Sequence, residues 1–202
     1  LAAARDASER QTAAAAWLRE VPAALPEPEG YAALVRRWLW TFGPGTEADL
    51  VWWLGATRSA VRAALAEVAA VGVTLDDREQ GWLLPDDVEP VPEVTPWAAL
   101  LPTLDPTTMG WKRRGHYLHP DDAPFLFDTA GNGGTTAWWQ GWIVGCWAQR
   151  EDGRVEVVLR GDPGRQARAA LAAEADRLTS WLDGQVVGSA YAAPMLRGQR
   201  LP

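Results

Sequence analysis

Residues 31–87 contain three short helical patterns followed by two β-prone runs, and this order constrains the fold more than any other feature of the sequence. The first pattern covers residues 31–42, and Thr46 and Thr57 stand as N-caps before the second and the third. Asp49 follows Thr46 by three residues, which is similar to a capping box. The runs VTLDD and WLLPDD then flank the polar residues REQG, which predicts a β-hairpin.

Three helices, a short turn between the second and third, and a closing hairpin form the order of a winged helix, a version of helix-turn-helix. The sequence therefore predicts a winged-helix domain over residues 31–87. Its third helix is expected to bury one apolar stripe and to end at Gly72. The stripe consists of Val61, Ala64, Leu65, Val68 and Val71.

The outward face of this third helix carries little that can read DNA bases. Such a helix normally enters the major groove, where Arg, Lys, Asn or Gln would be needed. The face holds small side chains, at Ser59, Ala63, Ala66 and Ala70, and one acid, Glu67, on its flank. Either the helix touches phosphates through Arg58 and Arg62, or this face packs against a protein partner or a missing upstream domain. Arg78 at the hairpin tip is outnumbered by Asp76, Asp77 and Glu79.

Proline-rich stretches divide the chain. A helix is predicted over residues 8–20, and the run PAALPEPEG follows it as a linker. A second proline-rich linker, VEPVPEVTP, covers residues 88–96. The expected organisation is an N-terminal helix and linker over residues 1–30, a winged helix over 31–87 and a third region over 97–202. Because the sequence does not begin with Met, we expect a piece of a longer protein.

The third region is predicted to be rich in β-structure. Strands are expected over residues 135–139, 142–149 and 154–159, followed by a helix over 162–182 and a short strand over 185–187. The residues FLF, 125–127, form a short apolar run. The predicted fold class is therefore α+β: three helices with a β-hairpin wing, followed by a small β-rich α+β domain.

Composition excludes several classes of protein. The net charge of −7 argues against a wholly basic nucleic-acid coat protein, and most of the 13 tryptophans must belong to the core. A single cysteine, Cys146, lies in an apolar run, so we expect a buried thiol and no internal disulfide. No apolar window is long enough for a membrane span, and the first residues lack a secretory pattern. A cytoplasmic protein is expected.

The densest basic cluster is Lys112-Arg113-Arg114, with His116 two residues further on. Trp111 and Tyr117 flank it. Basic residues interleaved with aromatic ones can grip a nucleic-acid backbone. The alternative is a solvated basic turn with Trp111 in the core.

Other chemistries find little support. His116 and His119 have the spacing of a metal pair but no third ligand nearby, so no metal site is predicted. The glycine loop GNGG leads into a strand, whereas a phosphate loop requires a helix N-terminus. No catalytic residue and no cofactor are predicted within this chain.

Three segments resemble the AlkZ/YcaQ-like winged-helix DNA glycosylase family. Its segment LLP-x-x-D-x-x-x-x-G-x-x-x-R is matched by Leu100, Leu101, Pro102, Asp105, Gly110 and Arg114. Its strand G-x-x-x-G-x-W is matched by Gly141, Gly145 and Trp147, and ADLVWWLG is similar to the family's second helix. The resemblance covers about residue 31 to the C-terminus.

The resemblance implies tandem winged helices and a β-rich domain that together hold double-stranded DNA. It implies a structural role for Asp105, as a cap or as an arginine partner, and backbone contacts from Lys112, Arg113 and Arg114. Characterised relatives hydrolyse the N-glycosidic bond of alkylated bases with a Gln-x-Gln motif. No two glutamines here are two residues apart. Glycosylase activity is therefore expected only if a missing N-terminal domain supplies the motif, and the alternative is a non-enzymatic interaction module or a transcription regulator.

Overall fold

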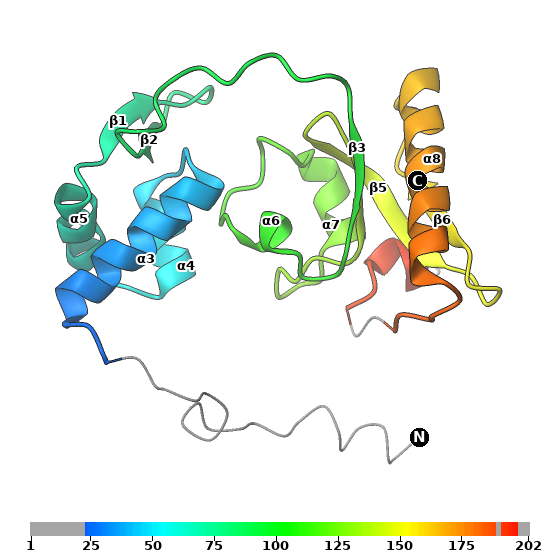
Figure 1. Ribbon diagram of the computed structural model, residues 1–202, viewed down its shortest axis with the longest axis horizontal. Coiled ribbons are helices and arrows are strands. Elements are labelled where there is room, and N and C mark those ends of the chain that lie inside the picture. The colour runs from blue at the N-terminus through cyan, green and yellow to red at the C-terminus, as the bar shows by residue number, and fades with distance from the viewer. Residues whose placement is uncertain (1–22, 189–190, 198–202) are drawn as a thin grey trace.

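The computed structural model describes residues 23–188 and 191–197, so the helix expected over residues 8–20 lies outside the described residues. The described chain forms two units side by side, and a long linker arches from one to the other (Figure 1). The N-terminal unit holds three helices and a hairpin, and the C-terminal unit holds a four-stranded sheet with helices around it. The α+β class is confirmed.

Helix α3 (Glu27–Phe42) begins four residues earlier than the sequence pattern predicted. The prolines assigned to the linker instead fit the helix start, because Pro28 lies in the first turn, where no backbone N–H is needed. Glu27 and Glu29 in the same turn also interact favourably with the helix dipole. Helix α3 then buries Val35, Trp38 and Leu39 in the core of the unit.

The next two helices begin at the predicted caps. Helix α4 (Glu47–Leu54) has the full capping box between Thr46 and Asp49, and it ends at Gly55 in the left-handed conformation. Helix α5 (Arg58–Glu67) is capped by the Thr57 side chain. Leu50, Val61, Ala64 and Leu65 from these helices meet α3 in one core.

The expected length of the third helix was wrong. Helix α5 ends at Glu67, because Ala69 takes a left-handed φ of 52° and turns the chain into strand β1 (Val71–Thr74). Strand β1 pairs antiparallel with β2 (Gln80–Leu83), which confirms the hairpin. An isolated antiparallel bridge pairs Gly45, in the α3–α4 connection, with Trp82 on β2.

The C-terminal sheet has the order β3-β4-β5-β6, and all neighbours are antiparallel. The three predicted strands are present as β4 (Thr136–Trp139), β5 (Trp142–Gln149) and β6 (Val155–Leu159). The edge strand β3 (Ala98–Leu101) was not predicted. The run FLF lies mostly in helix α7 (Ala123–Leu126), which follows the 3-10 turn η1 (Pro120–Asp122).

Two apolar layers cover the sheet. Helix α8 (Arg165–Leu182) packs on one face through Leu171, Ala175 and Leu182. The other face packs on Tyr117 and Leu118, on α7 and on the 3-10 turn η2 (Pro194–Arg197). Short helix α6 (Pro106–Met109) connects β3 to this second layer. The strand expected at 185–187 is absent from the described chain, and Val186 and Val187 are exposed.

None of the described helices combines the length and the apolar character that crossing a bilayer requires.

Candidate nucleic-acid interface

The segment that carries the basic cluster, residues 110–118, is the junction between the two units. Trp111 reaches into the N-terminal unit, where its ring lies edge-on to Phe42 at 5.2 Å and to Trp38 at 6.4 Å between centroids. Its indole N–H donates to the Phe42 carbonyl at 3.1 Å. In return, the Trp38 indole donates to the Gly110 carbonyl at 3.1 Å. Trp111 therefore belongs to the packing between the units. This agrees with the alternative interpretation of the cluster, in which Trp111 lies in the core.

A buried carboxylate fixes the same segment. Asp49 is only 2% exposed, and its Oδ1 accepts the backbone N–H groups of Lys112 at 2.9 Å and of Arg113 at 3.1 Å. Its Oδ2 accepts the Thr46 hydroxyl at 2.6 Å and the Thr46 backbone N–H at 3.1 Å. One side chain thus caps helix α4 and holds the backbone of the basic cluster.

Arg114 turns into the C-terminal unit. Its guanidinium donates to the carbonyls of Thr108, at 3.2 Å, and Gly131, at 3.0 Å, and lies 4.3 Å from the centre of the Phe127 ring. The expectation that three neighbouring cations gather on one surface is therefore corrected. The Arg114 side chain is engaged by two carbonyls and a ring, and the residue is only partly exposed.

Two other predicted arginines are paired with acids. Arg113 forms ion pairs with Glu79 and, at 3.9 Å, with Asp77, both from the hairpin. The hydrogen bond from Arg113 to Glu79 raises the pKa of the guanidinium. Arg62 donates to Glu47 at 2.7 Å, and this contact raises its pKa in the same way.

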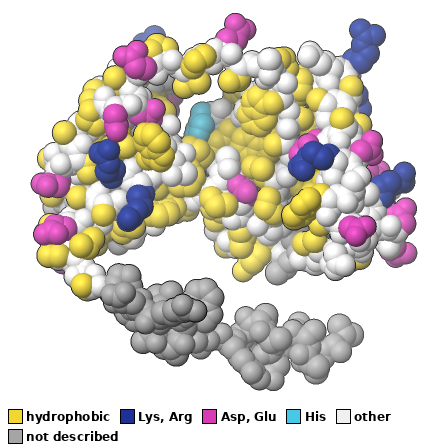
Figure 2. All heavy atoms as spheres, in the orientation of Figure 1, with side chains coloured by type: hydrophobic (Ala, Val, Ile, Leu, Met, Phe, Trp, Pro, Cys, Tyr) yellow, Lys and Arg dark blue, Asp and Glu magenta, His cyan; other side chains and the backbone are white. Residues whose placement is uncertain are grey.

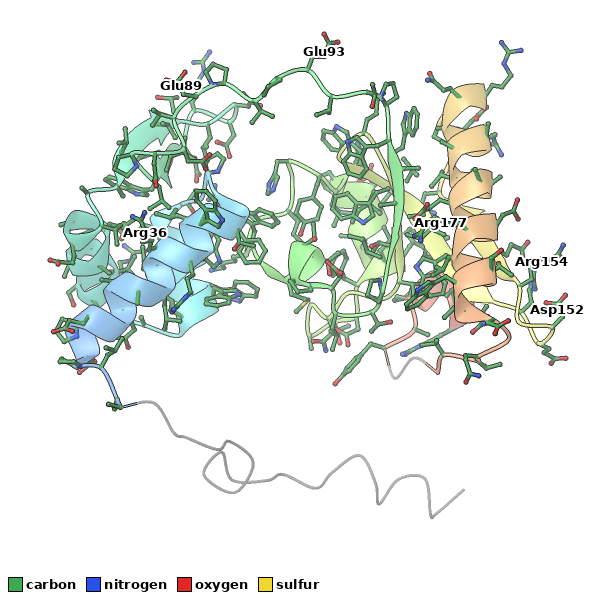
Figure 3. All side chains as sticks on the ribbon, viewed as in Figure 1. Arg36, Glu89, Glu93, Asp152, Arg154 and Arg177 are labelled. Atoms are coloured by element: carbon green, nitrogen blue, oxygen red, sulfur yellow. The ribbon has the colours of Figure 1, made fainter. Side chains whose placement is uncertain are left out.

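Lys112, Arg58 and Arg78 are exposed and form no ion pair with any described residue. Figure 2 shows the positive side chains of the visible face scattered over both units, with acidic side chains among them. The same view shows a hollow between the units beneath the linker, with hydrophobic side chains and a histidine at its walls. Figure 3 places Glu89 and Glu93 on the linker, pointing outward.

His116 packs against the junction. Its ring lies edge-on to Trp111 at 4.9 Å and to Tyr117 at 4.7 Å. Desolvation lowers the pKa of His116, and Asp49 and Asp77 oppose that shift only in part. The imidazole is therefore neutral at neutral pH, so it adds no positive charge there. Burial also raises the pKa of Tyr117, whose hydroxyl donates to the Thr108 carbonyl.

The remaining motif residues have structural roles. Asp105 caps α6 by accepting the Thr107 N–H at 2.8 Å, which confirms the capping role expected for it. A Cβ at Gly110 would stand 2.7 Å from the Phe42 ring, and one at Gly145 would collide with the backbone of β6. The Trp147 indole donates to the Leu101 carbonyl at 2.8 Å, which ties β5 to β3.

The outward face of α5 is apolar and open. Ser59, Ala63 and Ala66 are exposed, whereas Ala70, which was predicted on the same face, lies beyond the end of α5 and is partly buried. A cavity of about 340 Å³ adjoins this face, and its lining includes Tyr31, Ala60, Ala63 and three glutamates. A second groove of about 490 Å³ separates α5 from the hairpin. Neither holds an unpaired cation.

No group of three or more His, Cys, Asp or Glu side chains within residues 23–188 and 191–197 could hold a metal ion. Cys146 is fully buried, and burial raises its pKa to about 12, so the thiol is unreactive as expected. Sequence reasoning missed the contacts that Asp49, Trp38, Phe42 and Glu79 make with the basic cluster. Their contacts with it span long sequence separations, and only the capping pattern at Asp49 marked one of them.

The comparisons with known proteins agree with the resemblance noted in the sequence. A family model described as DNA glycosylase AlkZ-like matches residues 2–181. No curated protein matches the chain. Among solved structures, it is similar to Streptomyces sahachiroi DNA glycosylase AlkZ, with a TM-score of 0.68 and 17% identity. The match covers 83% of this chain and 47% of that one, so this chain spans about half the length of that protein and shares its fold. Because the family model covers most of its length, this chain belongs to the AlkZ-like DNA glycosylase family.

Proposed function

We propose that this chain is the DNA-holding part of a DNA-repair protein of the glycosylase type. The observation that carries the proposal is the family match over residues 2–181, which includes both units. The double-stranded DNA is held through backbone phosphates, because the exposed face of α5 carries no side chain that reads bases.

In this proposal the N-terminal unit is a winged helix. The order α3, α4, α5, β1 and β2 supports it, and so does the isolated bridge from Gly45 to Trp82, which ties the α3–α4 connection to the hairpin. The hairpin is then the wing, and its acids lie beside Arg113.

The junction segment is the proposed phosphate contact. Asp49 fixes the backbone of Lys112 and Arg113, and both side chains are exposed. Lys112 is free of ion pairs among the described residues. Arg58 and Arg78 are secondary contacts, whereas Arg62 and Arg114 are engaged with protein groups. His116 adds a neutral ring beside them.

Base excision is not assigned to any residue here. The seven glutamines of the sequence include no pair in the Gln-x-Gln arrangement. In this proposal the groups that activate water come from outside these 202 residues, and this chain positions the duplex.

The test is fluorescence anisotropy with a labelled 20-base-pair duplex across a series of salt concentrations. Lys112→Ala/Arg113→Ala is expected to weaken binding about tenfold and to reduce the salt slope by about two. Arg154→Ala/Arg177→Ala removes the same charge far from the junction (Figure 3) and is expected to leave the slope unchanged. Equal slopes for both double variants would reject the junction as the DNA contact.

A second candidate function is protein recognition by the α5 face, favoured by its small exposed side chains and the adjoining cavity. Ala63→Cys can be labelled with a thiol reagent, because the native Cys146 is fully buried. Saturating duplex DNA should leave the labelling rate at this position unchanged if the face binds protein. A rate slowed severalfold, against an unchanged Ala173→Cys control on α8, would assign the face to DNA.

A further inference from the structure

Arg113 is held at two points, and only one of them can be released by a ligand. Its backbone N–H donates to the buried Asp49 carboxylate at 3.1 Å. Its guanidinium instead meets two hairpin carboxylates, Glu79 and Asp77. The position of the residue is therefore fixed by a buried contact, whereas the direction of its side chain depends on surface ion pairs.

These ion pairs are open to solvent. The side chains of Arg113, Asp77 and Glu79 are 54%, 59% and 40% exposed. Ion pairs this exposed are weak, because water and salt screen them and long side chains lose entropy in forming them. A phosphate, which the Arg guanidinium binds as a fork in the same way as a carboxylate, can replace them.

The hairpin acids also oppose an incoming phosphate by their charge. One guanidinium faces two carboxylates, so the group of three carries a net charge of −1. Asp77 is itself held in place, because its Oδ1 accepts the Glu79 backbone N–H at 3.1 Å. Asp77 therefore stays at this site whether or not Arg113 is bound to it.

We propose that Glu79, with Asp77, is an intramolecular competitor for the DNA phosphate that Arg113 binds. The hairpin acids occupy Arg113 in the free protein and release it when duplex DNA is bound. They lower the affinity of the junction for DNA, and they make no favourable contact with DNA themselves. This inference rests on the proposed function, since it concerns the same contact with DNA.

The experiment is a double-variant cycle on the full chain, with the labelled 20-base-pair duplex and anisotropy at low salt. Glu79→Gln keeps the size of the side chain and removes its charge. It is expected to tighten binding about fivefold. In the Arg113→Gln background the same substitution is expected to change affinity less than twofold. Asp152→Asn, at a turn remote from the junction (Figure 3), makes the same change in net charge and is expected to leave affinity within twofold.

The outcomes separate cleanly. Tightening that requires Arg113 supports the competitor. The competitor is overturned if Glu79→Gln leaves the affinity for DNA unchanged, or if it tightens binding equally with and without Arg113. Either result, in a wild-type chain that binds DNA, leaves the proposed function standing. Absence of binding by every variant at low salt overturns both. Melting temperatures of all variants, measured in parallel, verify that each is folded.

Discussion

The Asp49 carboxylate accepts the backbone N–H of Lys112 at 2.9 Å, across 63 positions of the sequence. This hydrogen bond joins the first turn of α4 to the junction segment of the other unit. Since Asp49 is buried and also caps its own helix, the contact fixes where the basic cluster stands relative to the N-terminal unit.

Asp49→Ala should destabilise the protein by about 3 kcal/mol, because the buried N–H of Thr46 and the part-buried N–H groups of Lys112 and Arg113 lose their carboxylate acceptor. Asp49→Asn keeps one carbonyl oxygen and should cost less. Urea denaturation followed by circular dichroism measures both. A loss no larger than that of the surface variant Asp152→Asn would contradict the role given to this carboxylate.

Trp111→Ala should lower the free energy of unfolding by about 3–4 kcal/mol, because removing a large aromatic side chain leaves a cavity between the units. The units should also unfold less cooperatively. Calorimetry is expected to show one transition for the wild-type chain and two for the variant. Trp181→Ala, at a tryptophan that is 73% exposed, is the matched control and should change little.

His116 should make the stability depend on pH below neutrality. Desolvation lowers its folded-state pKa from the ordinary 6.5, so the unfolded chain takes up the proton first as the pH falls. The contribution of neutral His116 to the stability is therefore present above about pH 6.5, and it is lost as the pH falls through the lowered pKa of the folded state. Melting temperatures from pH 8 to pH 5 should fall less in His116→Gln than in the wild type. His119→Gln should follow the wild type, and a parallel course for all three would contradict the account.

Gly110→Ala should cost about 1–3 kcal/mol, because the added Cβ meets the Phe42 ring at 2.7 Å, where the two units touch. Thermal unfolding measures the loss. Gly115→Ala is the control in the same segment, since a Cβ at that position meets no atom within 4 Å. Equal melting temperatures for both variants would show that the contact is relaxed in solution.

Local signals predicted the helices and the hairpin well. Thr46 and Thr57 mark helix starts because a cap is a short-range contact between residues a turn apart. The helical spacing of apolar residues did not predict where α5 ends, because the backbone changes direction there. Val71 continued the apolar stripe of α5, yet the left-handed Ala69 moves it into a strand.

Long-range pairing could not be read in the same way. Strand β3 forms because residues such as Leu100 pair with β4, in this case with Ala137. The residues near Leu100 in the sequence do not indicate this distant partner. The run at 185–187 had strand-like composition but found no strand to pair with. The Gln149 side chain bonds it instead, to the Gln185 carbonyl at 2.8 Å and the Val187 N–H at 2.9 Å.

The site was predictable only as a segment. The interleaving of basic and aromatic residues singled out residues 111–117, but it did not show that this segment joins the two units or which of its side chains face solvent. Arg114 turns inward because two carbonyls and the Phe127 ring receive it. Arg113 meets the hairpin acids because the fold brings Glu79 beside it.

The salt slope of duplex binding for Lys112→Ala and Arg114→Ala, measured side by side, tests the central claim most directly. Lys112→Ala should lower the slope by about one and leave the melting temperature unchanged, as a phosphate contact would. Arg114→Ala should lower the melting temperature, through the loss of about 2 kcal/mol, and leave the slope as in the wild type. A reduced slope for Arg114→Ala with unchanged stability would contradict the inward role of Arg114 and the division of the basic cluster that follows from it.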